Sequence, residues 1–268
     1  MTVNDSHQQQ RTEEQLRQEI CCIGKRLYER GLIAACEGNL SARLDGGRIL
    51  TTPAGLSKGL LEPADLVVTD EKGRVLEGAR SPSSEQAMHI LIYELRPDVR
   101  AVCHAHPPTA TGFAAAGRAL DQALLPEVVI ALGHVPLARY GTPGTKELTE
   151  SLEPLVPHYD AILMANHGAV TMGPDLQTAF HRMEIVEQFA KVALITSLLG
   201  GSKLLSGREV AKLIAARPRY GCAAPPGSSP ELPVTAEQAE AEDGRIQLTA
   251  DELEVLIDEA VRKDRARR

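Results

Sequence analysis

Short β-like runs alternate with helical patterns along most of the 268-residue chain, and this alternation limits its possible folds more than any other feature. Apolar residues recur at helical spacing in residues 12–31, 83–96, 109–116, 146–155 and 176–199. Between them lie runs typical of strands, at residues 48–52, 66–69, 99–106, 128–132, 135–138 and 161–165. Interspersed strands and helices predict one α/β or α+β domain over about residues 11–221.

Two helix starts carry a capping box, in which a hydroxyl residue is followed three positions later by Gln. Thr12 with Gln15 predicts the start of the first helix, and Ser83 with Gln86 predicts the start of the second.

Composition argues against several classes of protein. Aromatic residues make up 3% of the chain and Trp is absent, so we expect a core of Ala, Leu, Val and Ile. The net charge is −7 and no stripe of Lys and Arg runs through the body of the chain, which argues against a nucleic-acid partner. The basic cluster at residues 262–268 is short, and we interpret it as a solvated helix end. No apolar run approaches the ~18 residues of a membrane span, and residues 1–10 contain no apolar signal segment. Five cysteines, an odd number without regular spacing, argue against a disulfide framework and for a reducing compartment, so we expect a cytoplasmic protein. The lack of a CxxC pair argues against a thiolate zinc site.

Three histidines are the candidate metal ligands. His104 and His106 lie two residues apart in a predicted strand, so their rings should stand on the same face, where a shared divalent cation would satisfy both. His167 follows the predicted strand at residues 161–165 and precedes Gly168, which allows a close backbone approach. Three histidines with an open fourth position are a common catalytic zinc shell. The alternative for His167 is a histidine in a surface loop.

Glu85 is the candidate acid/base. It lies in the first turn of the predicted second helix, on the inward face that Met88 and Ile92 share. An inward carboxylate needs a partner, which a metal ion or a substrate hydroxyl would supply. The alternative is a carboxylate favoured only by the helix N-terminus. His89 lies one turn later, where it could support Glu85 from behind the site, but we interpret it as a packing residue.

Small polar segments offer donors for an anion. Residues 38–41, 52–55 and 82–84 supply amide and hydroxyl groups, and Ser83 with Ser84 marks a helix N-terminus, a natural phosphate site. Each segment taken alone is more often a turn than a phosphate-binding site.

Taken in order, these segments resemble the class II aldolase/adducin family, whose best-known enzyme is fuculose-1-phosphate aldolase. The motifs are GNLS (38–41), TPAG (52–55), PSSE (82–85), HAH (104–106) and NHG (166–168). The resemblance implies a three-layer α/β/α subunit with a central, mainly antiparallel sheet, and a homotetramer with active sites at subunit interfaces.

The resemblance also implies roles for individual residues. His104, His106 and His167 would bind Zn²⁺ or another divalent metal. Glu85 would be the acid/base, and a metal ligand when substrate is absent. Phosphate would be bound by Asn39, Gly55, Ser83 and Ser84.

The implied reaction cleaves a ketose 1-phosphate, similar to fuculose or rhamnulose phosphate, into dihydroxyacetone phosphate and an aldehyde through an enediolate. Within the same fold, a sugar-phosphate decarboxylase, epimerase or dehydratase would use the same chemistry, and an adducin-like assembly protein would use none. Two positions depart from the aldolase. Ile130 aligns with its aldehyde-protonating tyrosine, and Ala54 replaces a hydroxyl residue. Tyr140 lies nearby in the sequence.

The residues before and after the domain are not expected to be part of its core. Residues 1–10 predict a disordered tail, and residues 222–246 are rich in Pro and predict a flexible linker. Residues 247–268 predict an amphipathic helix with Leu253 and Ile257 on its apolar stripe. This helix would fold back on the core or a neighbouring subunit. Alternatively it resembles the peptides that load enzymes into bacterial microcompartments, and would contact the shell.

Overall fold

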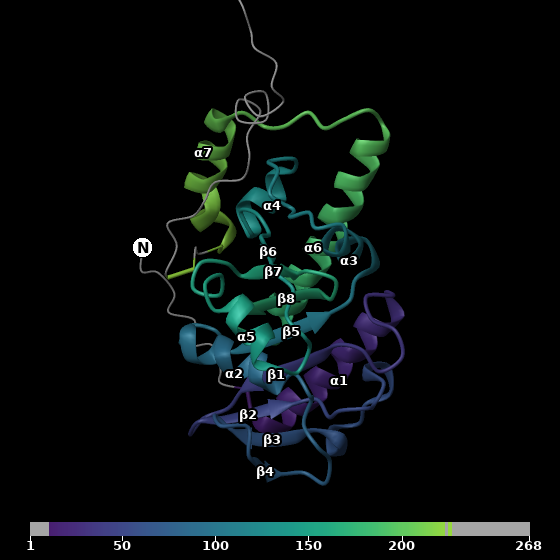
Figure 1. The fold of residues 1–268 in the computed structure, drawn as a ribbon. Helices are drawn as coiled ribbons and strands as arrows, with labels where there is room; N and C mark the ends of the chain where they lie inside the picture. Colours follow the sequence, from purple (N-terminus) through teal and green to yellow (C-terminus); the bar gives the residue numbers. More distant parts are fainter. Residues whose placement is uncertain (1–10, 223–224, 227–268) are drawn as a thin grey trace, which may run out of the picture.

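The centre of the molecule is one eight-stranded sheet, seen in a computed structural model that describes residues 11–222 and 225–226 (Figure 1). Its strands lie in the order β4-β3-β2-β1-β5-β8-β7-β6. They are β1 (Asn39–Arg43), β2 (Arg48–Thr51), β3 (Val67–Asp70), β4 (Val75–Glu77), β5 (Ala101–Ala105), β6 (Leu137–Ala138), β7 (Ala161–Met164) and β8 (Gly168–Gly173).

The described strands pair antiparallel except for β6 and β7, which run parallel. The register places His104 of β5 between Asn39 of β1 and Val170 of β8. Strand β5 therefore lies at the middle of the sheet, and it carries the first predicted metal ligand.

Helices cover both faces of the sheet and make it the central of three layers, as the resemblance implied (Figure 1). One core packs α1, α3 and α6 against the sheet, and the other packs α2 and α5 against the opposite face. Along β5 the side chains alternate between these cores, with Cys103 in the first and Val102 in the second. The helices are α1 (Glu13–Glu29), α2 (Gln86–Leu95), α3 (Pro108–Ala115), α4 (Pro126–Ala131), α5 (Lys146–Leu152), α6 (Leu176–Leu198) and α7 (Gly207–Ala216).

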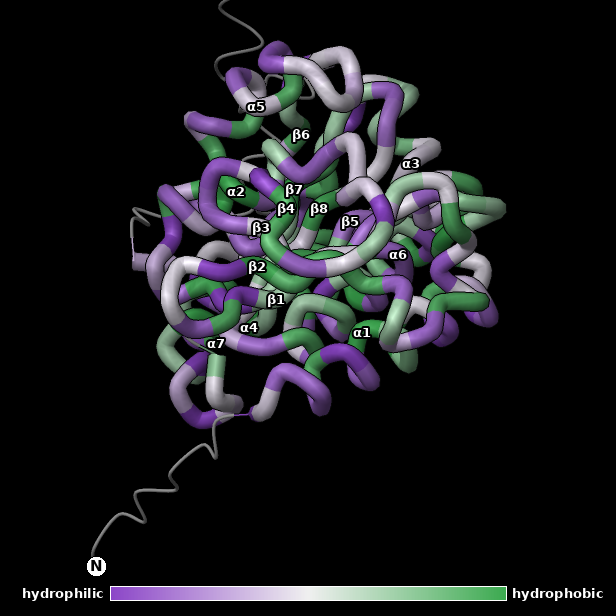
Figure 2. Tube along the Cα trace, turned by 90° about the horizontal axis from the view of Figure 1, so that it is seen from below, coloured by the Kyte–Doolittle hydropathy of each residue, from purple (hydrophilic) through white to green (hydrophobic). Residues whose placement is uncertain are grey.

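Aliphatic side chains fill both cores, as the composition predicted. Phe180 and Phe189 of α6 are buried exceptions in a set dominated by Leu, Ile, Val and Ala. Figure 2 shows hydrophobic segments gathered along the strands at the centre. No described helix is long and apolar enough to cross a membrane.

The first capping box is confirmed and the second is wrong. The Thr12 side chain accepts from Gln15 N at the start of α1, and the Gln15 side chain accepts from Thr12 N. Helix α2 instead begins after Glu85, its N-cap residue, and the Gln86 side chain donates to Thr69 on β3. The packing of α2 against the sheet draws Gln86 away from its own helix terminus.

The strand predicted at residues 128–132 is also wrong. These residues form most of α4, which has Pro126 in its first turn, where the missing N–H and the fixed φ favour a helix. Val128 packs into the first core and Val129 against α7, so both sides of this short helix are buried. Burial on two sides explains an apolar run that resembles a strand.

The predictions for the two ends lie outside the described residues. This applies to the tail at residues 1–10, to the helix at residues 247–268, and to the linker at residues 222–246 apart from residues 222, 225 and 226.

Candidate metal centre

His104 and His106 stand side by side because strand geometry directs alternate side chains to one face. His104 is a completely buried residue of β5, and His106 follows directly after that strand. Their Nε2 atoms are 3.1 Å apart. Two imidazole nitrogens at this distance present a pair of ligand atoms to one point.

His167 reaches the same point from the turn between β7 and β8. The turn is closed by a hydrogen bond from His167 N to Met164 O, and Asn166 in it has a φ of 56°. Gly168 then pairs closely with β5, since a Cβ at this position would lie 2.6 Å from Ala105 O. Only glycine permits this approach, which holds His167 beside the end of β5.

The three rings form a nearly regular triangle. Their centroids are 4.8–5.0 Å apart, and one nitrogen from each ring lies within 4.8 Å of the others. His104 Nδ1 lies 2.9 Å from Ala169 O, to which it donates, so its Nε2 keeps a lone pair that faces the triangle. Three nitrogen donors with open remaining positions fit a catalytic divalent cation.

Glu85 lies against this triangle. Its Oε1 is 3.1 Å from His167 Nε2 and its Oε2 is 3.2 Å from His104 Nε2. Burial alone raises the pKa of the Glu85 carboxyl, but His104 and His167 outweigh it and hold the pKa well below its usual range. Glu85 Oε1 is buried and accepts no hydrogen bond from any described residue, which suits contact with a cation or a substrate.

A carboxylate also lies beside the third ring. Glu37 Oε2 is 3.5 Å from His106 Nδ1, on the side of the ring away from His104. Burial lowers the pKa of His106 to about 4, so the ring is neutral at pH 7, as a metal ligand must be. Glu37 was not singled out from the sequence, although it directly precedes the GNLS motif.

Four buried polar residues form a hydrogen-bonded chain that leads from Glu85 into the interior, a link that no sequence motif showed. Asn39 donates to Glu85 Oε2 at 2.8 Å and contacts His89 through its other amide atom. His89 contacts Ser41, which contacts Tyr93. His89, interpreted above as a packing residue, thus belongs to a hydrogen-bonded chain that ends at the site.

The predicted phosphate-binding residues fall into two groups. Backbone hydrogen bonds from Ala54 N to Ser81 O and from Ser83 N to Thr52 O join the segments that contain Gly55 and Ser83. Gly55 and Ser84 are exposed, whereas Asn39 is buried with its amide directed to Glu85 and His89. The phosphate roles themselves stay predictions.

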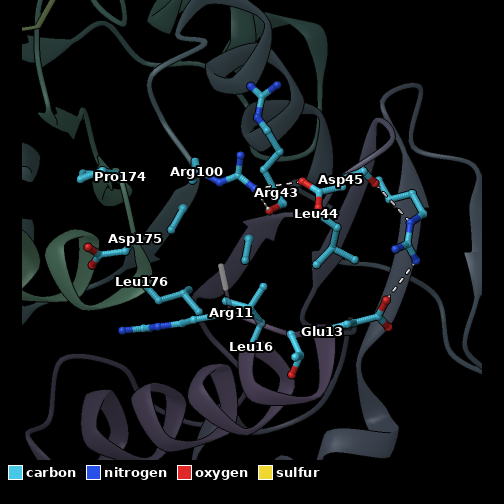
Figure 3. A pocket seen from close by; sticks show the side chains of 14 residues that line it. Arg11, Glu13, Leu16, Arg43, Leu44, Asp45, Arg100, Pro174, Asp175 and Leu176 are labelled. Carbon is cyan, nitrogen blue, oxygen red and sulfur yellow. Dashed lines mark hydrogen bonds and ion pairs between the residues drawn. The ribbon is translucent and has the colours of Figure 1, made fainter. Parts of the chain in front are cut away.

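A separate pocket of about 820 Å³ lies at the opposite end of the strands (Figure 3). Arg43 lines this pocket and lies four residues along β1 from Asn39, which corresponds to about 13 Å between their backbones. Three of its four arginines pair with acidic side chains, Arg100 with Asp45 at 3.6 Å, Arg48 with Glu13 at 3.0 Å and Arg11 with Glu19. The fourth, Arg43, donates to Tyr93 O. The described cluster of potential metal ligands lies at the histidine triangle and not in this pocket, so the triangle is the better candidate site.

Comparison with known proteins agrees with this geometry. The sequence profile of the Class II Aldolase and Adducin N-terminal domain matches residues 18–194. The 3-oxo-tetronate 4-phosphate decarboxylase of Escherichia coli K12 is 35% identical over 210 residues, covering 76% of this chain and 97% of the relative. The 5-deoxy-D-ribulose 1-phosphate aldolase of Bacillus thuringiensis is 34% identical over 206 residues, covering 76% and 96%.

A solved structure of an L-fuculose 1-phosphate aldolase matches with a TM-score of 0.71 at 34% identity, covering 75% of this chain and 94% of that one. The profile match includes all three histidines and Glu85. The chain therefore belongs to the class II aldolase/adducin family.

Proposed function

We propose that this protein is a metal-dependent lyase that breaks the bond between the α and β carbons next to the carbonyl of a phosphorylated sugar and releases dihydroxyacetone phosphate. The observation that carries the proposal is the triangle of His104, His106 and His167 with Glu85 within 3.2 Å of two of its rings.

The relatives support the choice of product. Cleavage of 5-deoxyribulose 1-phosphate or fuculose 1-phosphate between C3 and C4 yields dihydroxyacetone phosphate and an aldehyde. Loss of CO₂ from a 3-oxo-tetronate 4-phosphate yields the same phosphate ester. All three reactions named for the relatives therefore pass through the enediolate of dihydroxyacetone phosphate, and differ in what departs.

The three histidines would hold the divalent cation, for which we propose zinc because its usual catalytic shell is three protein ligands and an open position. The cation supplies Lewis-acid stabilisation of the negative charge on the enediolate, worth several kcal/mol.

The chain's own residues would position the substrate and move its protons. The segments of Gly55, Ser83 and Ser84 would bind the phosphate with their N–H and hydroxyl groups. In aldol cleavage the C3–C4 bonding pair stays on C3, the C4 hydroxyl loses a proton and C3 gains one. Glu85, whose Oε1 accepts no hydrogen bond from any described residue, would deliver the proton to C3.

A phosphosugar aldolase is the first candidate, and one observation favours a decarboxylase as the second. The aldolase family places a tyrosine at the aldehyde oxygen, but this chain has Ile130 there, a side chain 9% exposed on α4. Departing CO₂ has no hydroxyl proton to transfer, so decarboxylation does not need that tyrosine.

A panel of phosphorylated substrates tests the proposal. The zinc-loaded protein is given fuculose, rhamnulose and 5-deoxyribulose 1-phosphates and 3-oxo-tetronate 4-phosphate, and dihydroxyacetone phosphate, aldehyde and CO₂ are measured. An aldehyde product supports the aldolase and CO₂ the decarboxylase. If no substrate releases dihydroxyacetone phosphate from metal-loaded protein, the proposal is wrong.

The variant Glu85→Gln provides the control for the chemistry. It should keep its metal and lose turnover by about 10²–10⁴-fold, the usual contribution of general acid/base catalysis. Turnover at the wild-type rate in this variant would remove Glu85 from the mechanism.

A further inference from the structure

Helix α2 and strand β1 interlock through a continuous line of buried polar side chains. Glu85, His89 and Tyr93 follow one another at intervals of four residues on one face of α2, and Asn39 and Ser41 alternate with them from β1. The chain runs from Tyr93 OH to Ser41 Oγ (2.8 Å), from Ser41 Oγ to His89 Nδ1 (2.6 Å), and from His89 Nε2 to Asn39 Oδ1. It ends with Asn39 Nδ2 at 2.8 Å from Glu85 Oε2.

Each of these four linking residues is buried. His89 and Ser41 are completely inaccessible, and Asn39 and Tyr93 are 3% and 4% exposed. Buried polar groups in this number are costly unless all are paired, and here every member has its partner. The full pairing of these buried groups indicates that the hydrogen-bonded line belongs to the structure of the site.

The direction of the hydrogen bonds follows from the chemistry of the groups. The Glu85 carboxylate only accepts, so the amide nitrogen of Asn39 must face it, and Asn39 Oδ1 must then accept from His89 Nε2–H. Burial lowers the pKa of His89 to about 3, so its ring is neutral at pH 7 and carries only this one proton.

Neutral His89 must therefore accept at Nδ1. Ser41 donates to it, and Tyr93 donates to Ser41. Burial raises the pKa of the Tyr93 hydroxyl, which keeps that donor protonated. All four bonds consequently point in one direction, toward Glu85 Oε2.

We propose that His89 is a positioning residue for proton transfer: by fixing the amide of Asn39 it holds Glu85 Oε2 and leaves Oε1 as the oxygen that exchanges a proton with the substrate. The inference rests on the proposed function, in which Glu85 moves the proton at C3. It adds that the two carboxylate oxygens are inequivalent.

The contacts of the two oxygens support this assignment. Oε2 accepts the Asn39 hydrogen bond, whereas Oε1 accepts none from any described residue and faces His167. A carboxylate held by one oxygen cannot rotate freely about its last torsion. The free oxygen therefore keeps one orientation relative to the histidine triangle, as efficient proton transfer requires.

The test measures the proton step alone. Dihydroxyacetone phosphate is incubated in deuterium oxide with zinc-loaded protein, and replacement of its hydroxymethyl C–H by deuterium is followed by NMR. In this exchange Glu85 takes a proton from carbon to give the enediolate and returns a deuteron, so atoms and charge balance. No second substrate is required.

His89→Leu should slow the exchange by roughly 10²-fold, the usual effect of a misplaced catalytic group, while zinc content and KM stay near wild type. His89→Gln, whose amide N–H can replace Nε2–H, should recover much of the rate. Tyr93→Phe, at the far end of the hydrogen-bonded line, should lose less of the exchange rate than His89→Leu.

Thr171→Val is the control. It removes a buried hydroxyl that donates to Ala179 O on the opposite face of the sheet, and it should exchange like wild type.

The outcomes separate the two proposals. If wild-type protein neither exchanges dihydroxyacetone phosphate nor cleaves a phosphosugar, the proposed function fails. If wild type exchanges and folded His89→Leu does so at the same rate, the positioning role is wrong while the function stands.

A crystal structure of zinc-loaded His89→Leu gives a readout that does not depend on activity. We expect the contact between Asn39 Nδ2 and Glu85 Oε2 to be lost. Retention of this contact with Glu85 in place would overturn the inference. If His89→Leu does not fold, the same comparison is made with His89→Ala and His89→Asn, whose short side chains cannot reach Asn39 Oδ1. Exchange at the wild-type rate in either variant while the Asn39 amide is displaced or disordered would overturn the inference.

Discussion

The orientation of individual imidazole rings decides whether this site can hold a cation. His104 is fixed by its bond to Ala169 O, and His106 has a carboxylate 3.5 Å from its outer nitrogen. Such outer partners set the tautomer and keep the inner nitrogen available to metal. The site thus combines ligand atoms with groups that orient them.

Replacing one ligand should release the metal. We expect His106→Ala to fall from about one zinc per chain to a small fraction of that, because two histidines and a carboxylate make a much weaker set. Elemental analysis after gel filtration measures this, with Thr171→Val as the folded control. Unchanged metal content in His106→Ala would contradict the ligand assignment.

The buried His89 should make stability depend on pH. Its folded-state pKa of about 3 lies below the usual 6.5, because burial disfavours the charged ring more than Glu85 favours it. Above pH 6.5 the ring is neutral in both states and its contribution is complete. Below that, the unfolded chain binds a proton that the folded chain does not, so stability falls until about pH 3.

His89→Gln should therefore flatten the pH profile. Urea unfolding of metal-free protein between pH 4 and 7 should show a wild-type slope that exceeds that of the variant by up to about 1.4 kcal/mol per pH unit. Parallel profiles would show that His89 takes up its proton in the folded state.

Single residues of the site were predictable where a local period directs them. The strand period places His104 and His106 on one face, and this follows from the sequence alone. Glu85 points inward as predicted, although it is the N-cap of α2 and not a residue of its first turn. The bond between Asn39 and His89 was not predictable, because it depends on how β1 and α2 pack together. The spacing of Glu85, His89 and Tyr93 by four was the available signal.

At the scale of elements, α3 is held by a residue far away in the chain. Glu187 of α6 is 3% exposed and accepts from Thr109 N (3.1 Å), Thr109 Oγ1 (2.8 Å) and Ala110 N (3.0 Å) in the first turn of α3. A carboxylate at a helix N-terminus satisfies unpaired N–H groups and favours the helix dipole. Because α3 begins two residues after His106, this contact also fixes the backbone that leads from His106 into α3.

Removing this carboxylate should destabilise the fold. Glu187→Ala leaves buried donors without partners, and we expect it to lose about 1–3 kcal/mol of unfolding free energy in urea. Lys191→Ala is the matched control, since it removes only the exposed partner of the same carboxylate at 3.4 Å and should change stability by less than about 0.5 kcal/mol. Equal losses in the two variants would contradict the capping role.

Elements were predictable when one period and clear ends marked them. Helix α6 shows its apolar stripe and an Asp175 N-cap, and β7 is a short apolar run. Helix α4 was misread because burial on two sides hides the helical period. Strand β8 was not predicted, although it places His167, since Gly168–Gly173 has small residues and no strong alternation.

For the whole molecule, the sheet order explains how distant segments form one site. Strand β5 lies between β1 and β8, so Asn39, His104 and the His167 turn meet at one end of the central strands. Local patterns contain no information on strand order, and only the family resemblance predicted the three-layer arrangement. The homotetramer implied by the same resemblance stays a prediction.

The final prediction concerns the segment beyond the domain. All eight predicted site residues lie between Asn39 and His167, and the described cores are built from residues 16–214. If residues 247–268 form a docking peptide, deletion of residues 235–268 should leave the melting temperature, zinc content and turnover unchanged. If the predicted amphipathic helix is a docking peptide, the shortened protein should no longer co-purify with a microcompartment shell protein that binds the full chain.

Loss of catalysis on deletion would instead mean that the segment folds back and completes an active site, in its own subunit or in a neighbour. Fusing residues 235–268 to an unrelated soluble protein separates the two cases. A docking peptide transfers shell binding to the new carrier, because an amphipathic helix presents its apolar face independently of the enzyme. A segment that folds back gives the carrier no shell binding, since its partner surface belongs to this domain.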